Sequence, residues 1–216
     1  VLSFLNKVVI EMKVSDMFWR IFEAVKYRLK NSLNKSKFDY YCRKYNVVCG
    51  QSVTMTNGCP QIECLNSSKI IIGNNVSFMS YGSTSWYCNN KIRCRNGGVI
   101  EIPDFVGING GAIICSGTKI TIGKHVHIGG GTLIIDSDFH STNYLERRDP
   151  LRDCPCAKIK PVCIEDDVFI GTHVIIGKGV HIGARSIIAA GSVVIRDIPS
   201  DCIAGGNPCK VIKQIK

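Results

Sequence analysis

An aliphatic residue recurs at every sixth position in the C-terminal half of this chain. The uninterrupted series is Ile164, Ile170, Ile176, Ile182, Ile188 and Val194. An amphipathic helix requires apolar residues at intervals of three and four, and a half-buried strand requires strict alternation, so a period of six fits neither. It is typical of a β-helix, in which each hexapeptide forms one side of a coil. The repeat therefore predicts a mainly β architecture with three short sides per coil.

The same period extends upstream, and glycine accompanies it. One series runs through residues 102, 108 and 114, and another through 122, 128 and 134, with two extra residues between them. Glycine directly follows the aliphatic residue at Gly171, Gly177 and Gly183. We expect these glycines where a corner needs unusual backbone angles, which would account for the 21 glycines of the chain.

The first 50 residues lack this repeat. Phe18, Phe22, Val25 and Leu29 follow one another at helical spacing after Asp16, a good N-cap. We predict a helix from Asp16 to residue 30, followed by a linker over residues 31–37, which are rich in Asn, Ser and Lys. The expected organisation is a basic helical segment over 1–50 and a β-helix domain with a C-terminal tail over 51–216.

The positive charge of the chain is concentrated in its N-terminal segment. The whole chain has a net charge of +10, and residues 1–50 hold ten Lys or Arg against four Asp or Glu. In one interpretation, this helix packs on the β-helix or on a neighbouring subunit. The other places a basic amphipathic helix on a membrane surface. No apolar run reaches the roughly 18–20 residues that span a bilayer, and no zinc-finger, RNP or KH motif indicates a nucleic-acid partner.

The twelve cysteines are scattered and include no Cys-x-x-Cys pair. This pattern is typical of reduced cysteines in a cytoplasmic protein rather than of a disulfide scaffold. Cys154, Cys156 and Cys163 lie close together in sequence, but four-ligand zinc sites favour wider, paired spacing. We therefore expect no metal, with a site at these three cysteines as the alternative.

The repeat is interrupted once by a long insertion. Thirty residues separate Ile134 from Ile164 where six are expected, which predicts a protruding loop near 141–160. Long loops on rigid scaffolds tend to be functional. At the root of the loop stands His140, a residue type that can take a proton from an alcohol near neutral pH. Asp136 and Asp138 precede it and are candidates to orient its ring or stabilise its cation.

The repeat resembles that of the hexapeptide acyltransferases, and the segment Ile135-Asp-Ser-Asp-Phe-His-Ser resembles the active-site segment of their sugar O-acetyltransferases. The galactoside, maltose and polysaccharide acetyltransferases are of this type. The resemblance implies a left-handed parallel β-helix, His140 as the general base and Asn109 as a substrate-binding residue. It also implies a homotrimer that binds acetyl-CoA in a groove between subunits.

The C-terminal segments 189–199 and 204–212 are similar to the closing coil of that family. On this resemblance Thr172, Ala190 and Gly191 are small residues whose backbone lets the pantetheine of acetyl-CoA approach. Arg196 and Lys210 stand at positions for the CoA phosphates, since basic groups bind phosphate.

The sequence therefore predicts a cytoplasmic enzyme of polysaccharide biosynthesis, with association to a membrane as the alternative location. It would transfer an acetyl group from acetyl-CoA to a sugar or polysaccharide hydroxyl by direct attack on the thioester. The alternatives are N-acetylation of an amino sugar or antibiotic, a zinc enzyme of the γ-carbonic-anhydrase type, and a non-catalytic β-helix used for assembly.

Overall fold

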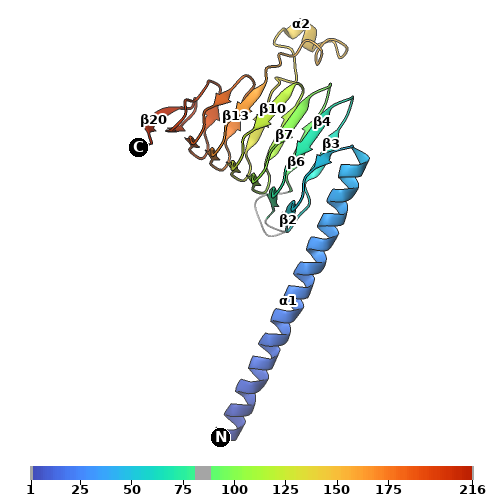
Figure 1. Ribbon diagram of the computed structural model, residues 1–216, viewed down its shortest axis with the longest axis vertical. Helices are drawn as coiled ribbons and strands as arrows, with labels where there is room; N and C mark the ends of the chain where they lie inside the picture. The colour runs from blue at the N-terminus through green and yellow to red at the C-terminus, as the bar shows by residue number, and fades with distance from the viewer. Residues whose placement is uncertain (1, 81–88, 216) are drawn as a thin grey trace.

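The chain forms a β-helix whose three sides are sheets of parallel strands, with one long helix at its N-terminal end (Figure 1). The computed structural model describes residues 2–80 and 89–215, and up to residue 15 it describes the backbone only.

Sheet A contains β1 (Val48–Cys49), β4 (Lys69–Ile72), β7 (Val99–Ile102), β10 (Lys119–Ile122), β13 (Val162–Ile164) and β16 (His181–Ile182). Sheet B contains β2 (Thr54–Thr56), β5 (Ser77–Met79), β8 (Gly107–Ile108), β11 (His127–Ile128), β14 (Phe169–Ile170), β17 (Ile187–Ile188), β19 (Cys202–Gly205) and β20 (Lys210–Gln214). Sheet C contains β3 (Gln61–Cys64), β6 (Lys91–Cys94), β9 (Ile113–Ser116), β12 (Leu133–Ile135), β15 (Ile175–Ile176) and β18 (Val193–Val194).

The six-residue period is confirmed as one side of a coil. Residues of the series pair across parallel strands with partners eighteen positions later, and the pairs are Ile164↔Ile182, Ile170↔Ile188 and Ile176↔Val194. Each pair belongs to a different sheet. Three hexapeptides therefore make one coil in this part of the chain, and each aliphatic residue stacks on its equivalent in the next coil.

The core of the β-helix consists of these stacked side chains. The repeat residues of all three sheets are almost completely buried, including Ile120, Ile134 and Ile170 at 0% exposure. Fully burying one such side chain stabilises a fold by roughly 1.5–3 kcal/mol before the entropic cost of ordering it. The extra length of the insertion therefore leaves the coil, because placing it inside would break this column.

Close approach between coils, and not backbone angle, requires Gly171 and Gly183, two of the three glycines that follow the repeat residues. At the third, Gly177, φ is not positive and an added Cβ would make only ordinary contacts, from 3.6 Å. Gly171 and Gly183 do not have positive φ, whereas His173 and Arg185, two positions later, have φ of 56° and 60°. A Cβ on Gly171 would lie 2.6 Å from the backbone nitrogen of Ala190 in the next coil. The sequence-based explanation for these two glycines was wrong, since the corner places its left-handed residue elsewhere.

We expect Gly171→Ala to lower the free energy of unfolding by about 1–3 kcal/mol, because the methyl group must push two coils apart. Denaturant titration measures this loss. Gly117→Ala is the matched control, because its Cβ would first meet Asp136 Oδ1 at 3.8 Å, an ordinary contact. Equal losses in the two variants would contradict the steric explanation.

The N-terminal segment is one continuous helix, α1 (Leu2–Lys44). Its C-terminal end packs against β2 and β3. Phe38 is completely buried there, and its ring lies 6.0 Å from that of Phe78. Tyr41 and Tyr45 also pack on the core, at the three- and four-residue spacing that places side chains on one helix face. No helix in the described chain is long and apolar enough to cross a membrane.

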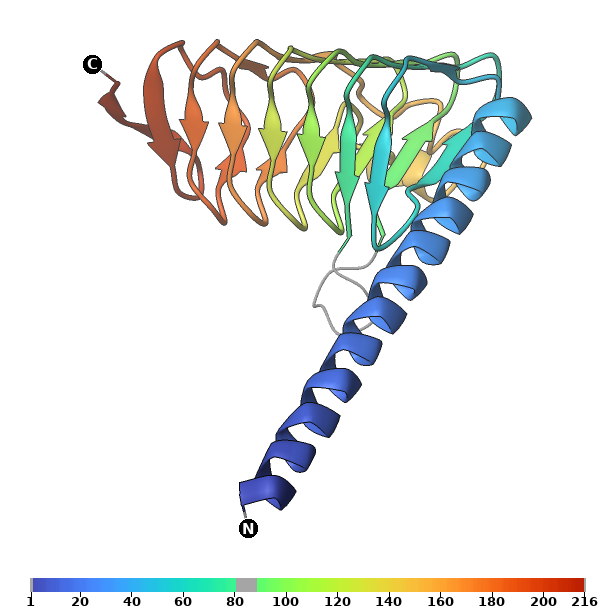
Figure 2. The same cartoon turned by 60° about the horizontal axis from the view of Figure 1, so that its bottom comes forward.

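Two sequence-based boundaries of this segment were wrong. Residues 31–37 are helical and not a linker, and Asp16 lies inside the helix rather than at its start. Residue propensity is a weak prior that tertiary packing overrides, and Phe38 anchors the helix directly after the predicted linker. Figure 2 shows that α1 extends far beyond the β-helix, so its apolar residues near Phe18 do not pack on the strands.

The C-terminal tail closes the last coil. β20 pairs antiparallel with β19, whereas the neighbouring strands of sheet B pair parallel. An added antiparallel strand covers the hydrogen-bonding groups that the last parallel strand would otherwise expose.

Candidate functional site

The predicted loop leaves the β-helix between β12 and β13 and projects from it (Figure 1). Its neck is a short antiparallel pairing, in which Ser137 bridges Ile159 and the amide of Lys160 donates to Asp136 O at 2.9 Å. The loop contains one short helix, α2 (Tyr144–Arg147), whose N-cap Asn143 accepts from the amide of Leu145. The insertion is therefore an ordered structure that starts at one corner of the coil.

His140 lies at the root of this loop and contacts Asp153 from its far side. Nδ1 of His140 lies 2.6 Å from Asp153 Oδ2, so in the tautomer with its proton on Nδ1 the ring donates to the carboxylate. The His140 side chain is 64% exposed and that of Asp153 13%. Such a pairing leaves Nε2 unprotonated and open to solvent, the arrangement of a general base.

The carboxylate of Asp153 is held by two donors. Besides His140, the amide of Ser141 donates to Asp153 Oδ1 at 2.9 Å. These hydrogen bonds, that of His140 first, place the pKa of Asp153 below its ordinary value. Asp153 therefore stays ionised across the neutral range and keeps accepting from Nδ1. The pairing is lost only when acid protonates the carboxylate, below its ordinary pKa of about 3.9.

Ser141 organises the loop around this pair. It is buried, its hydroxyl donates to Glu146, and its carbonyl accepts from Arg147 Nη1 at 2.7 Å. Arg152 in turn lies 3.4 Å from Glu146. The loop arginines are thus engaged within the loop itself, and Arg148 lies over the Tyr144 ring.

The two carboxylates proposed from sequence to assist His140 have other partners. Asp136 is completely buried and accepts from Ser116 Oγ at 2.6 Å and from the amides of Gly117 and Thr118 at 2.7 and 2.9 Å. Asp138 pairs with Lys178 Nζ at 2.5 Å. The expectation that either residue orients the His140 ring was wrong, because Asp153 occupies that position. The alternation of side chains along a strand cannot reveal a hydrogen-bond partner that lies thirteen residues away and is brought back by a folded loop.

The backbone next to His140 is in an unusual conformation. Phe139 has φ of 60°, a left-handed conformation that is uncommon for a bulky residue. Its amide donates to Ser137 Oγ at 2.9 Å. Left-handed non-glycine residues also occur at ordinary turns of the β-helix, such as His173 and Arg185, so this angle does not by itself mark a functional site.

The residues expected to bind substrate and pantetheine lie at a different corner of the coil. Asn109, Thr172, Ala190 and Gly191 all occupy turns that lead from sheet B to sheet C, which we call the B–C corner. The Gly191 amide donates to Thr172 O at 2.9 Å, so these turns stack on one another. Thr172 and Ala190 are exposed, and their backbone amides donate no hydrogen bond to any group in the described part of the chain. Asn109 Oδ1 is buried without a hydrogen-bond partner in that part of the chain.

His140 lies at the next corner, where turns lead from sheet C to sheet A, which we call the C–A corner. Arg196 occupies this corner in the last coil, and Lys210 begins β20 beside Gly205, close to the B–C corner. Both side chains are exposed. One chain therefore presents the predicted residues in two groups, separated by the width of sheet C.

The alternative metal sites do not assemble in the structure. Among the described residues, no three His, Cys, Asp or Glu side chains are close enough to hold a metal ion. Cys154, Cys156 and Cys163 are exposed free cysteines. The other four histidines lie at exposed positions on the outside of the coils, and His125 stacks on Phe105.

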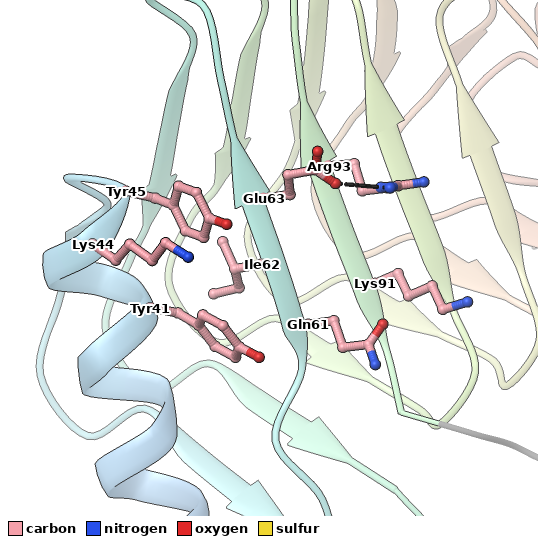
Figure 3. Close-up of a pocket in the computed structure, with 8 residues that line it drawn as sticks. All are labelled: Tyr41, Lys44, Tyr45, Gln61, Ile62, Glu63, Lys91 and Arg93. Atoms are coloured by element: carbon pink, nitrogen blue, oxygen red, sulfur yellow. Dashed lines mark hydrogen bonds and ion pairs between the residues drawn. The ribbon is translucent and has the colours of Figure 1, made fainter.

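A separate pocket lies where α1 meets sheet C (Figure 3). Its volume is about 390 Å³, and Tyr41, Lys44 and Tyr45 point into it from the helix toward β3. Arg93 and Arg95 both bind Glu63 at 2.8 Å, which neutralises its charge. The remaining lining residues are Gln61, Ile62 and Lys91. The pocket lies apart from the His140 loop, because β9 separates its strand β6 from β12, where that loop begins.

Comparison with known proteins finds a family whose description matches one part of the chain. The family described as Bacterial transferase hexapeptide (six repeats) matches residues 164–196, where the period is cleanest. The hexapeptide-repeat containing-acetyltransferase VCA0836 of Vibrio cholerae, in its complex with acetyl coenzyme A, is 37% identical over 63% of this chain and 71% of that chain, with a TM-score of 0.49. The chain is therefore similar to hexapeptide-repeat acetyltransferases, and the family model matches its most regular repeats. A second structure of the Vibrio protein matches 85% of this chain and 81% of that chain, with 29% identity and a TM-score of 0.55. The predicted fold class, a left-handed parallel β-helix, is confirmed.

Two curated proteins are also similar to this chain in sequence. The Saccharomyces cerevisiae protein named "Putative acetyltransferase YJL218W" is 45% identical over 122 residues, 56% of this chain and 59% of that protein. The 2,3,4,5-tetrahydropyridine-2,6-dicarboxylate N-acetyltransferase of Staphylococcus aureus (strain MRSA252) is 38% identical over 94 residues, 44% of this chain and 33% of that protein. The chain thus spans less than two thirds of the length of either relative.

Proposed function

We propose that this chain is an acetyltransferase that transfers the acetyl group of acetyl-CoA to a hydroxyl group of a sugar or glycan. The His140–Asp153 pair carries the proposal, because it leaves an exposed ring nitrogen ready to accept a proton. The names of the yeast, Staphylococcus and Vibrio relatives support acetyl transfer. The resemblance of residues 135–141 to the sugar O-acetyltransferases supports a sugar acceptor.

The reaction needs one base and no covalent enzyme intermediate. His140 Nε2 takes the proton of the acceptor hydroxyl while its oxygen attacks the carbonyl carbon of the thioester. The new C–O bond forms and the C–S bond breaks. The thiolate of CoA leaves and receives the proton that His140 holds. Asp153 stabilises the imidazolium between these two transfers, and a backbone amide is expected to stabilise the oxyanion.

The two groups of site residues favour a site shared between subunits. His140 lies at the C–A corner, whereas Asn109 and Thr172 lie at the B–C corner of the same chain. Sheet C lies between them, and its outward side chains near the loop, such as Leu133 and Ile175, are partly exposed and apolar. A homotrimer that packs these corners together would bring both groups to one acetyl-CoA molecule. Arg196 and Lys210 are its proposed phosphate ligands.

Release of free thiol from acetyl-CoA, measured with a panel of sugars, tests this function. We expect turnover that depends on a sugar hydroxyl. Thiol release that is equally fast without any acceptor, or no release with any sugar or amine, would overturn the proposal.

N-acetylation is the second candidate, and the 38% identity with the Staphylococcus N-acetyltransferase favours it. An amino sugar and the matching sugar alcohol differ only in the acceptor atom. Faster turnover of the amine would therefore assign N-acetylation, and faster turnover of the alcohol would assign O-acetylation.

Asp153→Asn is expected to lower kcat by roughly 10²-fold with little change in KM for acetyl-CoA. Asparagine cannot hold the Nδ1–H tautomer or stabilise the imidazolium as a carboxylate does. The pH profile of kcat should also shift, which a merely structural role would not produce. Asp149→Asn is the control, because Asp149 belongs to the same loop and accepts from Leu151 instead. Similar kcat values and pH profiles for both variants would argue against the positioning role of Asp153.

A further inference from the structure

The projecting part of α1 exposes large apolar side chains. Every residue from 16 to 30 is exposed, and Figures 1 and 2 show this stretch extending away from the β-helix. Eight large apolar residues between positions 16 and 34 have exposed fractions of 48–71%, and they are Met17, Phe18, Trp19, Ile21, Phe22, Val25, Leu29 and Leu33. Single exposed apolar residues are ordinary, but a contiguous group of this size marks an interaction surface.

Five of these residues form one stripe, which we call the outer stripe. Phe18, Phe22, Val25, Leu29 and Leu33 are spaced by three or four residues, so they share one face of the helix. Leu29 and Phe38 are nine residues apart, which is about two and a half helical turns. The outer stripe therefore faces away from the side on which Phe38 packs into the core.

The side that contacts the β-helix is directly visible. Figure 3 shows Tyr41 of α1, and Tyr45 directly after the end of α1, pointing toward β3. Phe38 has no exposed surface, and both tyrosines are partly buried against the core. The packing of α1 on its own domain thus uses a different face and leaves the outer stripe uncovered.

Basic residues surround the outer stripe. Residues 16–44 contain eight Lys or Arg and three Asp or Glu. Two of the acidic residues are paired with lysines, Glu23 with Lys26 at 3.1 Å and Asp39 with Lys35. At about 100° per residue, Lys26 and Arg28 flank the stripe on opposite sides. The surface therefore combines an apolar band with positively charged margins.

We propose that the outer stripe binds the surface of an anionic lipid bilayer, with α1 lying in the interface. Helices with an apolar face and Lys or Arg at its margins bind in this way, and anionic lipid attracts the positive charge. A second copy of α1 would carry the same positive charge and be repelled, so the charge favours lipid over self-association. Trp19 is 63% exposed and stacks on Phe22 at the edge of the stripe, a position typical of interfacial tryptophan.

Flotation of the full chain with lipid vesicles tests this proposal independently of any enzymatic activity. Phosphatidylcholine vesicles with and without phosphatidylserine are the probes. We expect binding to the phosphatidylserine vesicles, weaker binding at high salt, and little binding to phosphatidylcholine alone. In a Trp86→Phe background, the Trp19 fluorescence should shift to shorter wavelength when vesicles are added.

Phe18→Ser/Phe22→Ser should weaken vesicle binding roughly tenfold or more, because both aromatic side chains would be buried in the bilayer. Tyr27→Ser is the matched control, since Tyr27 is also exposed but lies opposite the stripe, and it should bind like the parent chain. Because all three residues are exposed, circular dichroism and thermal unfolding should show an unchanged β-helix. No binding to either vesicle, or equal weakening by both variants, would overturn the proposal. The proposal would also be overturned if the double variant changed the oligomeric state of the chain but did not change its binding to vesicles.

Discussion

His140→Ala is expected to lower kcat for acetyl transfer by about 10²–10⁴-fold, the usual contribution of a positioned general base. The ring is exposed, and its only polar contact given by the structure is with Asp153. Removing it should therefore leave the unfolding temperature almost unchanged. The measurement is thiol release at saturating acetyl-CoA and acceptor.

The matched control for this variant is His127→Ala. His127 is an exposed histidine on β11, in sheet B, away from the loop. We expect it to keep nearly full activity. If His140→Ala retained most of the activity, the base would have to be another group and the mechanism above would be wrong.

Asp136→Ala is expected to lower the free energy of unfolding by about 3 kcal/mol or more. The substitution leaves Ser116 Oγ–H and the amides of Gly117 and Thr118 without their acceptor in a buried site. For a chain of this size the loss corresponds to a fall in Tm of roughly 6–12 °C. Calorimetry or thermal circular dichroism measures it.

Glu101→Ala provides the comparison for Asp136. Glu101 lies on the outside of sheet A and pairs with Lys119 at 3.2 Å, and the two side chains are 35% and 48% exposed. An exposed ion pair contributes about 0–1 kcal/mol, so its removal should hardly change Tm. A Tm for Asp136→Ala as high as that for Glu101→Ala would show that the buried hydrogen bonds have no net effect.

The loop was the part of the site that the sequence located well. The interval between Ile134 and Ile164 placed an insertion there, and His140 was the one histidine at the break in the repeat. The partner of His140 could not be predicted in the same way. Asp153 lies thirteen residues away, and only the antiparallel neck and the hydrogen bonds of Ser141 return it to the ring.

The period of six by itself determined the coil, its three sides and its core. A stack of aliphatic side chains can be buried continuously only if each returns to the same place every eighteen residues, so local spacing specifies the architecture. Tertiary structure alone decided which carboxylate meets His140, why Gly171 must lack a side chain, and which face of α1 is buried. Each of these depends on contacts between residues distant in sequence, such as Gly171 with Ala190 and Phe38 with Phe78. Spacing along the chain carries no signal for such contacts.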